Sequence, residues 1–151
     1  MEWVEVERIG RFWLEGPLDR LHVDGTTAIS TGTFVNTATG TVTLEAHAFL
    51  GPWVQLLTGS HDYTKFGHER MHSPPYTGRK SDIVLREGVW VAGGAIVVGP
   101  CEIGAHSVVS AGAVVTGIFP EYALIHGNPG HVVQDIRERA TNPLPCPMCQ
   151  G

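Results

Sequence analysis

The chain carries little charge and few basic residues. Of its 151 residues 17% are charged, and ten Lys and Arg against fifteen Asp and Glu give a net charge of −5 at pH 7. Nucleic acids and anionic membranes attract positive surfaces, so this composition argues against either as the main partner. No apolar run is long enough to cross a bilayer, and the acidic residues 1–5 do not form a cationic signal peptide. We therefore expect a cytoplasmic protein.

Cysteine is also scarce. Three cysteines give no disulfide framework. Cys146 and Cys149 have the spacing of half a zinc site, but a structural zinc site needs four ligands and the chain has no second pair. We therefore expect no metal there. Cys101 falls at a position in the repeat described next that favours burial in the core.

Residues 85–120 repeat every six positions. Each block begins with a bulky aliphatic residue, has Gly, Ala or Pro at its centre, and has a small or slender fifth residue in all but the last block. A period of six fits neither a helix nor a simple strand; it predicts a solenoid of short strands and corners. The first positions are Leu85, Val91, Val97, Ile103, Val109 and Val115, and the fifth are Val89, Ala95, Cys101, Ser107 and Ala113.

The same register appears upstream, with two interruptions. Val23, Ile29 and Val35 lead into Leu44, Leu50 and Leu56, with a slip of three residues near 38–40, and an excursion over 62–84 separates Leu56 from Leu85. With three blocks per turn, we expect three stacked columns. These are Leu44 with Leu85 and Ile103, Leu50 with Val91 and Val109, and Leu56 with Val97 and Val115.

The length indicates one domain built around this repeat. We expect residues 1–20 to cap one end, residues 21–120 to form the solenoid with its excursion loop 62–84, and residues 121–151 to form a C-terminal segment. Within that segment we expect a short helix over 131–140 and a mobile, proline-rich tail.

Two stretches resemble a known family. Residues 33–62 (TFVNTATGTVTLEAHAFLGPWVQLLTGSHD) and 87–115 (EGVWVAGGAIVVGPCEIGAHSVVSAGAVV), with 119–130 (FPEYALIHGNPG), are similar to hexapeptide-repeat acyltransferases, closest to galactoside and maltose O-acetyltransferases. The resemblance implies an all-β fold, a left-handed parallel β-helix, assembled as a homotrimer. It also implies transfer of an acetyl group from acetyl-CoA to a sugar or glycan precursor by direct attack in a ternary complex.

By resemblance, in its Gly59-Ser60-His61-Asp62 context, His61 is the candidate general base; position alone favours a surface histidine in a polar turn. It lies where the repeat breaks into the long excursion, and loops of such length are usually functional. Histidine is the commonest general base near neutral pH. Ser60, His61 and Asp62 do not form a triad, since neighbours on an extended chain point to alternate faces. By resemblance, Asn36 contacts or orients the acceptor; composition alone favours a turn asparagine.

The resemblance also assigns the acetyl-CoA groove, to Trp90, Gly93, Ala111 and Thr116. A backbone N–H near Gly93 is a candidate donor to the thioester carbonyl. The chain departs from the family where lysine or arginine usually meets the CoA phosphates, because it has Gly117 in one place and Gly130 and His131 in the other. The basic residues that could replace them are Arg79, Lys80, Arg137 and Arg139.

Two alternatives stay open. One is a solenoid that scaffolds a partner without catalysis. The other is a zinc protein like the γ-class carbonic anhydrases, using His61, His68 and His72; this is less favoured, because the ligands of those enzymes lie in the repeat strands, whereas His68 and His72 lie in an irregular loop. The sequence leaves open the identity of the acceptor and the choice between a hydroxyl and an amine.

Overall fold

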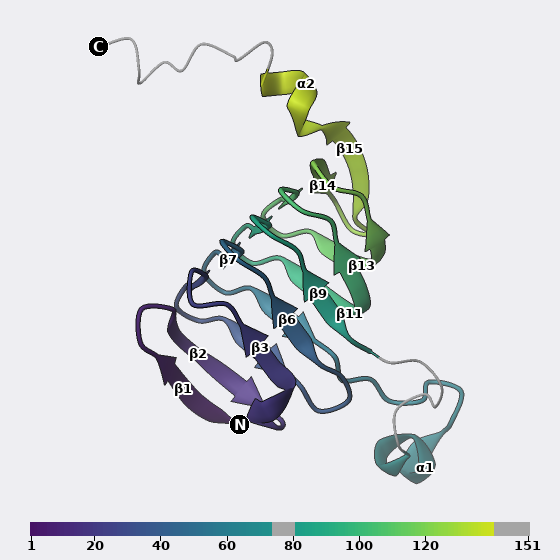
Figure 1. The fold of residues 1–151 in the computed structure, drawn as a ribbon. Coiled ribbons are helices and arrows are strands. Elements are labelled where there is room, and N and C mark those ends of the chain that lie inside the picture. Colours follow the sequence, from purple (N-terminus) through teal and green to yellow (C-terminus); the bar gives the residue numbers. More distant parts are fainter. Residues whose placement is uncertain (74–80, 141–151) are drawn as a thin grey trace.

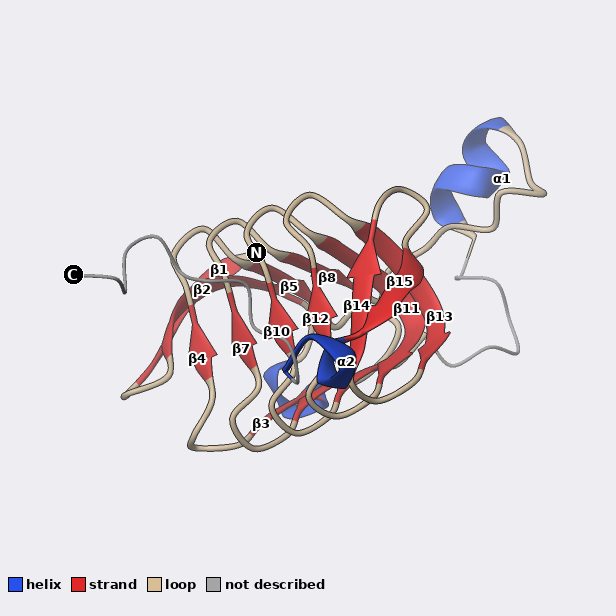
Figure 2. Ribbon diagram, turned by 90° about the horizontal axis from the view of Figure 1, so that it is seen from above, coloured by secondary structure: helices blue, strands red, loops and turns tan. Residues whose placement is uncertain are grey.

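The chain winds into a prism of stacked coils with a parallel ladder of strands on each of three faces (Figures 1 and 2). The computed structural model describes residues 1–73 and 81–140. Every strand of this part of the chain belongs to one fifteen-stranded sheet. None of its helices is long and apolar enough to span a membrane.

Each ladder is named here by an early strand. The β3 ladder contains β3 (Leu21–Val23), β6 (Val42–Leu44), β9 (Ile83–Leu85) and the second halves of β11 (Ile96–Ile103) and β13 (Val114–Phe119). The β4 ladder contains β4 (Ala28–Ile29), β7 (Phe49–Leu50), β10 (Trp90–Val91), β12 (Val108–Val109) and β14 (Ala123–His126). The β5 ladder contains β2 (Gly10–Glu15), β5 (Phe34–Asn36), β8 (Gln55–Leu57) and the first halves of β11 and β13.

The remaining elements lie at the ends or outside the coil. β1 (Glu2–Val6) runs antiparallel to β2, and β15 (His131–Asp135) runs antiparallel to β14. The helices are the 3₁₀ turn η1 (Leu18–Arg20), α1 (Gly67–His72) and α2 (Ile136–Ala140). Figure 1 shows α1 carried out from the body of the coil by the excursion.

The three predicted columns are confirmed. Leu85 pairs with Leu44 and Ile103, Val91 pairs with Leu50 and Val109, and Val97 pairs with Leu56 and Val115. All nine side chains are at most 1% exposed. Burying one such side chain contributes about 1.5–3 kcal/mol, so the columns are the main source of stability.

The small fifth positions are also buried, and Cys101 lies in the core as predicted. Where the residue at this position is polar, its hydroxyl forms hydrogen bonds with the backbone. Ser107 Oγ donates to the carbonyl of Pro120 at 2.9 Å and accepts from the N–H of Ala123 at 3.0 Å. A hydroxyl bonded in this way costs little inside the core, whereas an unbonded one would cost on the order of 1–3 kcal/mol.

The coil differs from the predicted bounds in two places: it begins before residue 21, and after the excursion it resumes before residue 85. β2 already pairs in parallel with β4 and β5, so the first turn starts at Gly10 rather than at residue 21. Only β1, with Trp3 packed on Trp13, lies outside it at this end. After the excursion, β9 starts at Ile83, which pairs with Val42 and Cys101.

The C-terminal segment differs from the expected helix over 131–140. Its first half is β15, and only residues 136–140 are helical. The β-branched pair Val132 and Val133 favours a strand, and the free edge of β14 accepts it. β14 in turn continues the β4 ladder beyond residue 120. The tail with Cys146 and Cys149 lies outside the described residues.

The register can be tested by placing a charge in a column. Ile103→Asp buries an unpaired carboxylate, and we expect a loss of several kcal/mol in the free energy of unfolding. His106 is exposed at a corner with φ 60°, a conformation that Asp tolerates, so His106→Asp should stay within about 0.5 kcal/mol of wild type. Thermal unfolding followed by circular dichroism measures both variants, and the reverse order of stabilities would refute the register.

Candidate active site

The two residues predicted to act on the acceptor lie in one cleft. Asn36 ends β5, and His61 follows β8 by four residues. β5 and β8 are parallel neighbours, so the chain leaves both strands at the same edge of the prism. The cleft has a volume of about 360 Å³. Its lining residues are Glu15, Asn36, Ala38, Thr39, Gly59, Ser60, His61 and Ser73.

Asn36 is fixed in place by hydrogen bonds to its carboxamide. Its Oδ1 accepts from the backbone N–H of Ala38 at 3.0 Å, and its Nδ2 donates to Glu15 Oε2 at 3.4 Å. The hydroxyl of Thr58 shares its one hydrogen between the backbone carbonyl of Asn36, at 2.9 Å, and Oδ1, at 3.2 Å. The bond to Ala38 is that of an asparagine closing a turn. The turn role is therefore compatible with the predicted site role, because the turn sets the direction in which the Nδ2 group faces.

His61 is exposed at the rim, and its imidazole accepts or donates no hydrogen bond within the described residues. Asp62 does not orient it. Both the side chain and the backbone N–H of Thr64 bond to Asp62 Oδ1, at 2.6 and 2.9 Å, and these bonds hold the pKa of the Asp62 carboxyl below its ordinary value. Asp62 thus closes its own turn, which leaves the imidazole available to an acceptor.

The excursion turns back on itself after His61. Lys65 forms an ion pair with Glu69 at 2.9 Å, and the guanidinium of Arg70 donates to the carbonyls of Lys65 and Tyr63. His68 and His72 stack on each other on α1 with ring centroids 4.0 Å apart. No group of three His, Cys, Asp or Glu side chains able to hold a metal occurs in residues 1–73 and 81–140. Arg79 and Lys80 lie outside the described residues.

The residues assigned to acetyl-CoA lie away from this cleft. Trp90 is on the β4 ladder, 42% exposed, and stacks on Phe49 with ring centroids 5.8 Å apart. Gly93 and Ala111 follow β10 and β12 in successive turns, at the edge between the β4 and β5 ladders. None of the three lines the cleft around His61.

The turns that hold Gly93 and Ala111 stack closely. Gly112 donates its N–H to the carbonyl of Gly93 at 3.1 Å. A Cβ on Gly51, one coil earlier, would lie 2.7 Å from the nitrogen of Gly93. Packing therefore requires glycine at Gly51, whereas a Cβ on Gly94 or Gly112 would meet nothing within 4 Å, and glycine suits these two positions through their φ of +70°.

Thr116 lies on the same edge as His61. It is in β13, where its Oγ1 is 3.4 Å from the carbonyl of Pro100. The chain thus brings together His61 and Asn36, keeps Trp90, Gly93 and Ala111 on another edge, and places Thr116 on the first edge but outside the cleft.

Glu15 is a cleft residue that the sequence reasoning missed. It ends β2, directly opposite Asn36 in the register. A signal was present, because Leu14, Val35 and Leu56 are 21 residues apart and mark one column of the coil. The residues that follow Leu14 and Val35 are Glu15 and Asn36, so that spacing would have placed them side by side.

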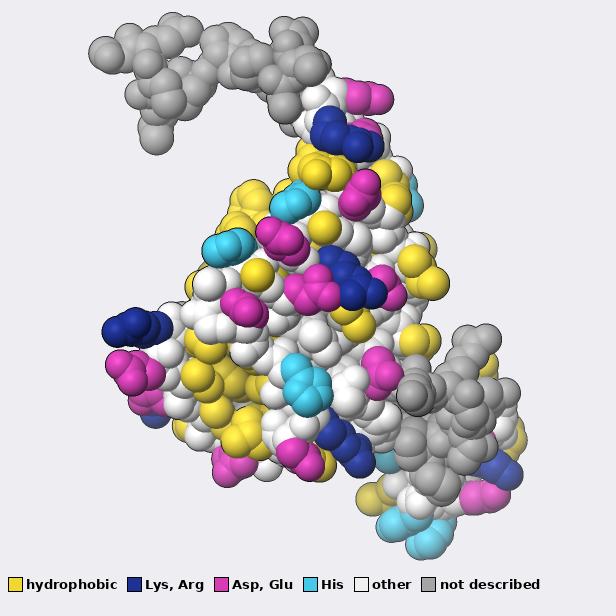
Figure 3. Space-filling view, viewed as in Figure 1, with side chains coloured by type: hydrophobic (Ala, Val, Ile, Leu, Met, Phe, Trp, Pro, Cys, Tyr) yellow, Lys and Arg dark blue, Asp and Glu magenta, His cyan; other side chains and the backbone are white. Residues whose placement is uncertain are grey.

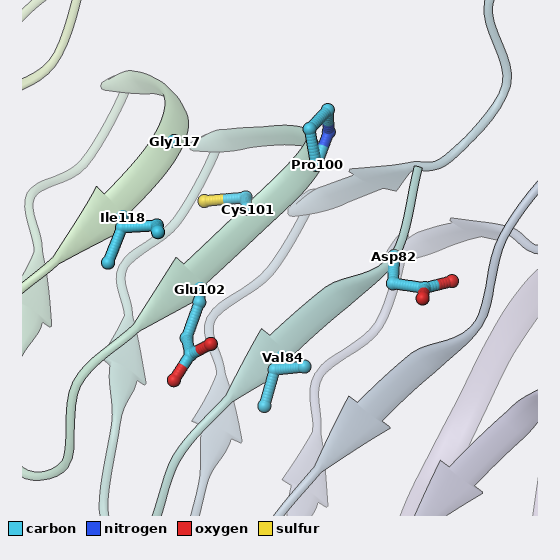
Figure 4. Close-up of a pocket in the computed structure, with 7 residues that line it drawn as sticks. All are labelled: Asp82, Val84, Pro100, Cys101, Glu102, Gly117 and Ile118. Carbon is cyan, nitrogen blue, oxygen red and sulfur yellow. The ribbon is translucent and has the colours of Figure 1, made fainter. Parts of the chain in front are cut away.

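A second hollow, of about 480 Å³, lies on the β3 ladder (Figure 4). Its lining residues are Asp82, Val84, Pro100, Cys101, Glu102, Gly117 and Ile118. Both carboxylates are engaged: Asp82 accepts from the N–H of Thr41 at 2.8 Å, and Glu102 pairs with Arg86 at 2.8 Å. Figure 3 shows acidic and basic side chains side by side over this face.

Cys101, at the bottom of this hollow, is not an activated nucleophile. Its side chain is 3% exposed, and burial, assisted by the charge of Glu102, raises the pKa of its thiol to about 12. A reactive cysteine needs a lowered pKa and access to solvent. A covalent acyl relay through this residue is therefore unfavourable.

Comparison with known proteins supports the interpretation of the six-residue period as a hexapeptide repeat. No family model matches the chain. A candidate acetyltransferase of Saccharomyces cerevisiae, YJL218W, is 29% identical over 98 residues, which are 65% of this chain and 47% of that protein. The chain spans about half the length of the curated relatives it matches.

Solved structures give the fold. The hexapeptide-repeat acetyltransferase VCA0836 of Vibrio cholerae aligns over 83% of this chain and 70% of its own, with a TM-score of 0.56 and 26% identity. That protein has also been solved with acetyl coenzyme A. A maltose O-acetyltransferase from Clostridium difficile 630 aligns over 82% of this chain and 66% of its own, with a TM-score of 0.53 and 24% identity.

The chain resembles the hexapeptide-repeat acetyltransferases in sequence and in fold. The predicted all-β fold is confirmed, and with it the left-handed parallel β-helix of these proteins. The family likeness expected from residues 33–62 and 87–130 is confirmed as well.

The state of Cys101 can be tested chemically. In a Cys146→Ser, Cys149→Ser background, we expect the folded protein to resist iodoacetamide at about pH 9, where an ordinary thiol is largely ionised. The same protein in denaturant should react quickly, because unfolding removes the burial that raises the pKa. Mass spectrometry reads the labelling, and rapid modification of the folded protein would show that the thiolate is accessible.

Proposed function

We propose that the protein transfers an acetyl group from acetyl-CoA to a hydroxyl or amine of a sugar or glycan precursor. The observation that carries the proposal is that His61 and Asn36 line the same cleft at the edge of a hexapeptide coil. Support for the donor comes from the V. cholerae protein solved with acetyl coenzyme A, and a sugar acceptor is suggested by the resemblance to maltose acetyltransferases. The expected cytoplasmic location suits this donor.

His61 would act as the general base. One ring nitrogen takes the proton of the acceptor hydroxyl while the acceptor oxygen attacks the acetyl carbon of the thioester. The carbon–sulfur bond then breaks, and the sulfur of CoA leaves with a proton returned by the imidazolium. A positioned histidine of this kind contributes about 10²–10⁴ in rate. The buried, protonated thiol of Cys101 favours this direct transfer over an acyl-cysteine intermediate.

Asn36 would orient the acceptor beside His61. Its carboxamide is held by the Ala38 N–H and by Thr58, so it presents a fixed group to the cleft at no further cost in side-chain entropy. The donor would lie against Trp90, Gly93, Ala111 and Thr116. Gly93 N–H forms no hydrogen bond in the described backbone and would donate to the thioester oxygen.

The separation of these groups supports the proposal that the site is shared between copies. His61 and Asn36 lie at the edge between the β5 and β3 ladders, whereas Gly93 and Ala111 lie at the edge between the β4 and β5 ladders. In a homotrimer with threefold symmetry, different edges of neighbouring prisms meet. We therefore infer that the His61 edge of one copy faces the Gly93 edge of the next.

Removing the base tests the chemistry. His61→Ala should lower kcat by about 10²–10⁴ and leave the KM for acetyl-CoA nearly unchanged, because the imidazole acts on the acceptor proton. The wild-type rate should fall on acidification, since a protonated imidazole accepts no proton, and this limb should be absent in the variant. Rates of CoA release against a panel of hexoses measure both effects.

The control for this experiment is His22→Ala, an exposed histidine on β3. It should retain wild-type turnover. Wild-type turnover in His61→Ala would instead remove the base from the mechanism. Absence of transfer from an intact wild-type trimer to any acceptor would favour the scaffold alternative.

A mixing experiment tests the shared site. Chains carrying His61→Ala and chains carrying Gly93→Trp should each be inactive alone. In randomly mixed trimers about a quarter of the sites would combine an intact His61 edge with an intact Gly93 edge, so about a quarter of the activity should return on co-expression. Light scattering checks assembly. A stable monomer, or mixed trimers without activity, would contradict a site between copies.

A further inference from the structure

The cleft around His61 is acidic, although sugar recognition alone does not require a charge. Glu15 lines the cleft opposite Asn36, with its Oε2 3.4 Å from Asn36 Nδ2. We propose that Glu15 forms part of the acceptor subsite and selects acceptors that are neutral or positively charged, excluding those that bring a phosphate or carboxylate into the cleft. This inference rests on the proposed acetyltransferase function.

The backbone directs Glu15 outward and holds it in place. Leu14 is 1% exposed in the core, so its neighbour Glu15 faces the surface. The next residue, Gly16, has φ +110°, and a Cβ there would lie 2.7 Å from Ala38 N and from Thr37 Oγ1. The hydroxyl of Thr37 also donates to the carbonyl of Pro17 at 2.8 Å. Glu15 is thus carried by a segment packed tightly against the turn that follows Asn36.

The Glu15 carboxylate has capacity for a ligand. Its hydrogen bond from Asn36 is long, and a carboxylate can accept about four hydrogen bonds. The lining side chains of Asn36, Thr39, Ser60 and Ser73 are polar and uncharged. An acceptor with neighbouring hydroxyls or an ammonium group can donate to Glu15, and its other polar groups find partners among these side chains.

The described cations near the cleft are held by other groups, although an arginine bonded to carbonyls keeps its charge. Arg20 donates to the carbonyls of Ala38 and Thr37, at 2.9 and 3.4 Å. Lys65 pairs with Glu69, and Arg70 binds backbone carbonyls. Asp62 adds a second negative charge just beyond His61. An anionic acceptor entering beside His61 would therefore meet the charge of Glu15, with no Lys or Arg among the residues that line the cleft to compensate it.

The test compares four forms of one sugar, chosen as the hexose with the fastest transfer: the neutral sugar, its 2-amino form, its uronic acid and its 6-phosphate. We expect wild-type kcat/KM for the neutral and amino forms to exceed that for the anionic forms by about tenfold. Glu15→Gln keeps the shape of the side chain and removes its charge. It should reduce this ratio by about fivefold, which corresponds to the upper end of the interaction energy of an exposed charge pair. The KM for acetyl-CoA should stay unchanged, which separates acceptor selection from a general loss of structure.

The matched control is Glu5→Gln, an exposed glutamate on β1 outside the cleft, which should keep the wild-type preference. A wild-type preference for the anionic sugars, or an unchanged ratio in Glu15→Gln, would overturn the role of Glu15 while leaving the acetyltransferase function in place. Absence of both acetyl-CoA binding and transfer would overturn the proposed function, and the inference with it.

Discussion

The interior columns constrain everything else in this molecule. Each coil must lay one bulky aliphatic residue over the one before it, as Leu14, Val35, Leu56, Val97 and Val115 do in the β5 ladder. An extra residue inside a coil would shift its side chains out of register, so extra residues have to leave at a corner. Residues 10–120 contain three such interruptions, and they leave at the same corner, after β2, β5 and β8.

That shared corner explains why the candidate site is there. The interruptions after β5 and β8 support each other: Asp82 accepts the Thr41 N–H at 2.8 Å, and a Cβ on Gly40 would lie 2.7 Å from the carbonyl carbon of Ser81. The cleft lies between the turn that follows Asn36 and the start of the excursion. Regular coils present flat faces with repeated side chains, whereas an irregular corner can bring unlike groups together.

The sequence predicted the buried columns, which depend on the six-residue period. It did not predict the elements at the two ends of the coil. The columns through Leu85, Val91 and Val97 follow from the six-residue spacing alone. The start of the coil at β2 did not follow, because the first two turns are 21 residues long and the six-residue pattern weakens there. β15 was missed because its pairing depends on the free edge of β14, a tertiary feature that local propensity does not contain. Glu15 was missed because it lies in the first turn, where the six-residue pattern is weak.

The donor side remains the less complete half of the site within one chain. The family's basic residues are absent, and Arg137, the described candidate to replace them, is committed elsewhere: it binds both carboxylate oxygens of Asp135 and lies over the ring of Tyr122, and Asp135 raises the pKa of its guanidinium. Moving it to a phosphate would break those contacts. In the proposed binding mode, the small-residue edge at Gly93 and Ala111 therefore has to supply much of the affinity for acetyl-CoA, through contacts of its backbone groups with the pantetheine arm. An affinity built on such an edge needs a second surface to close over it, which is the reason to expect the neighbouring copy there.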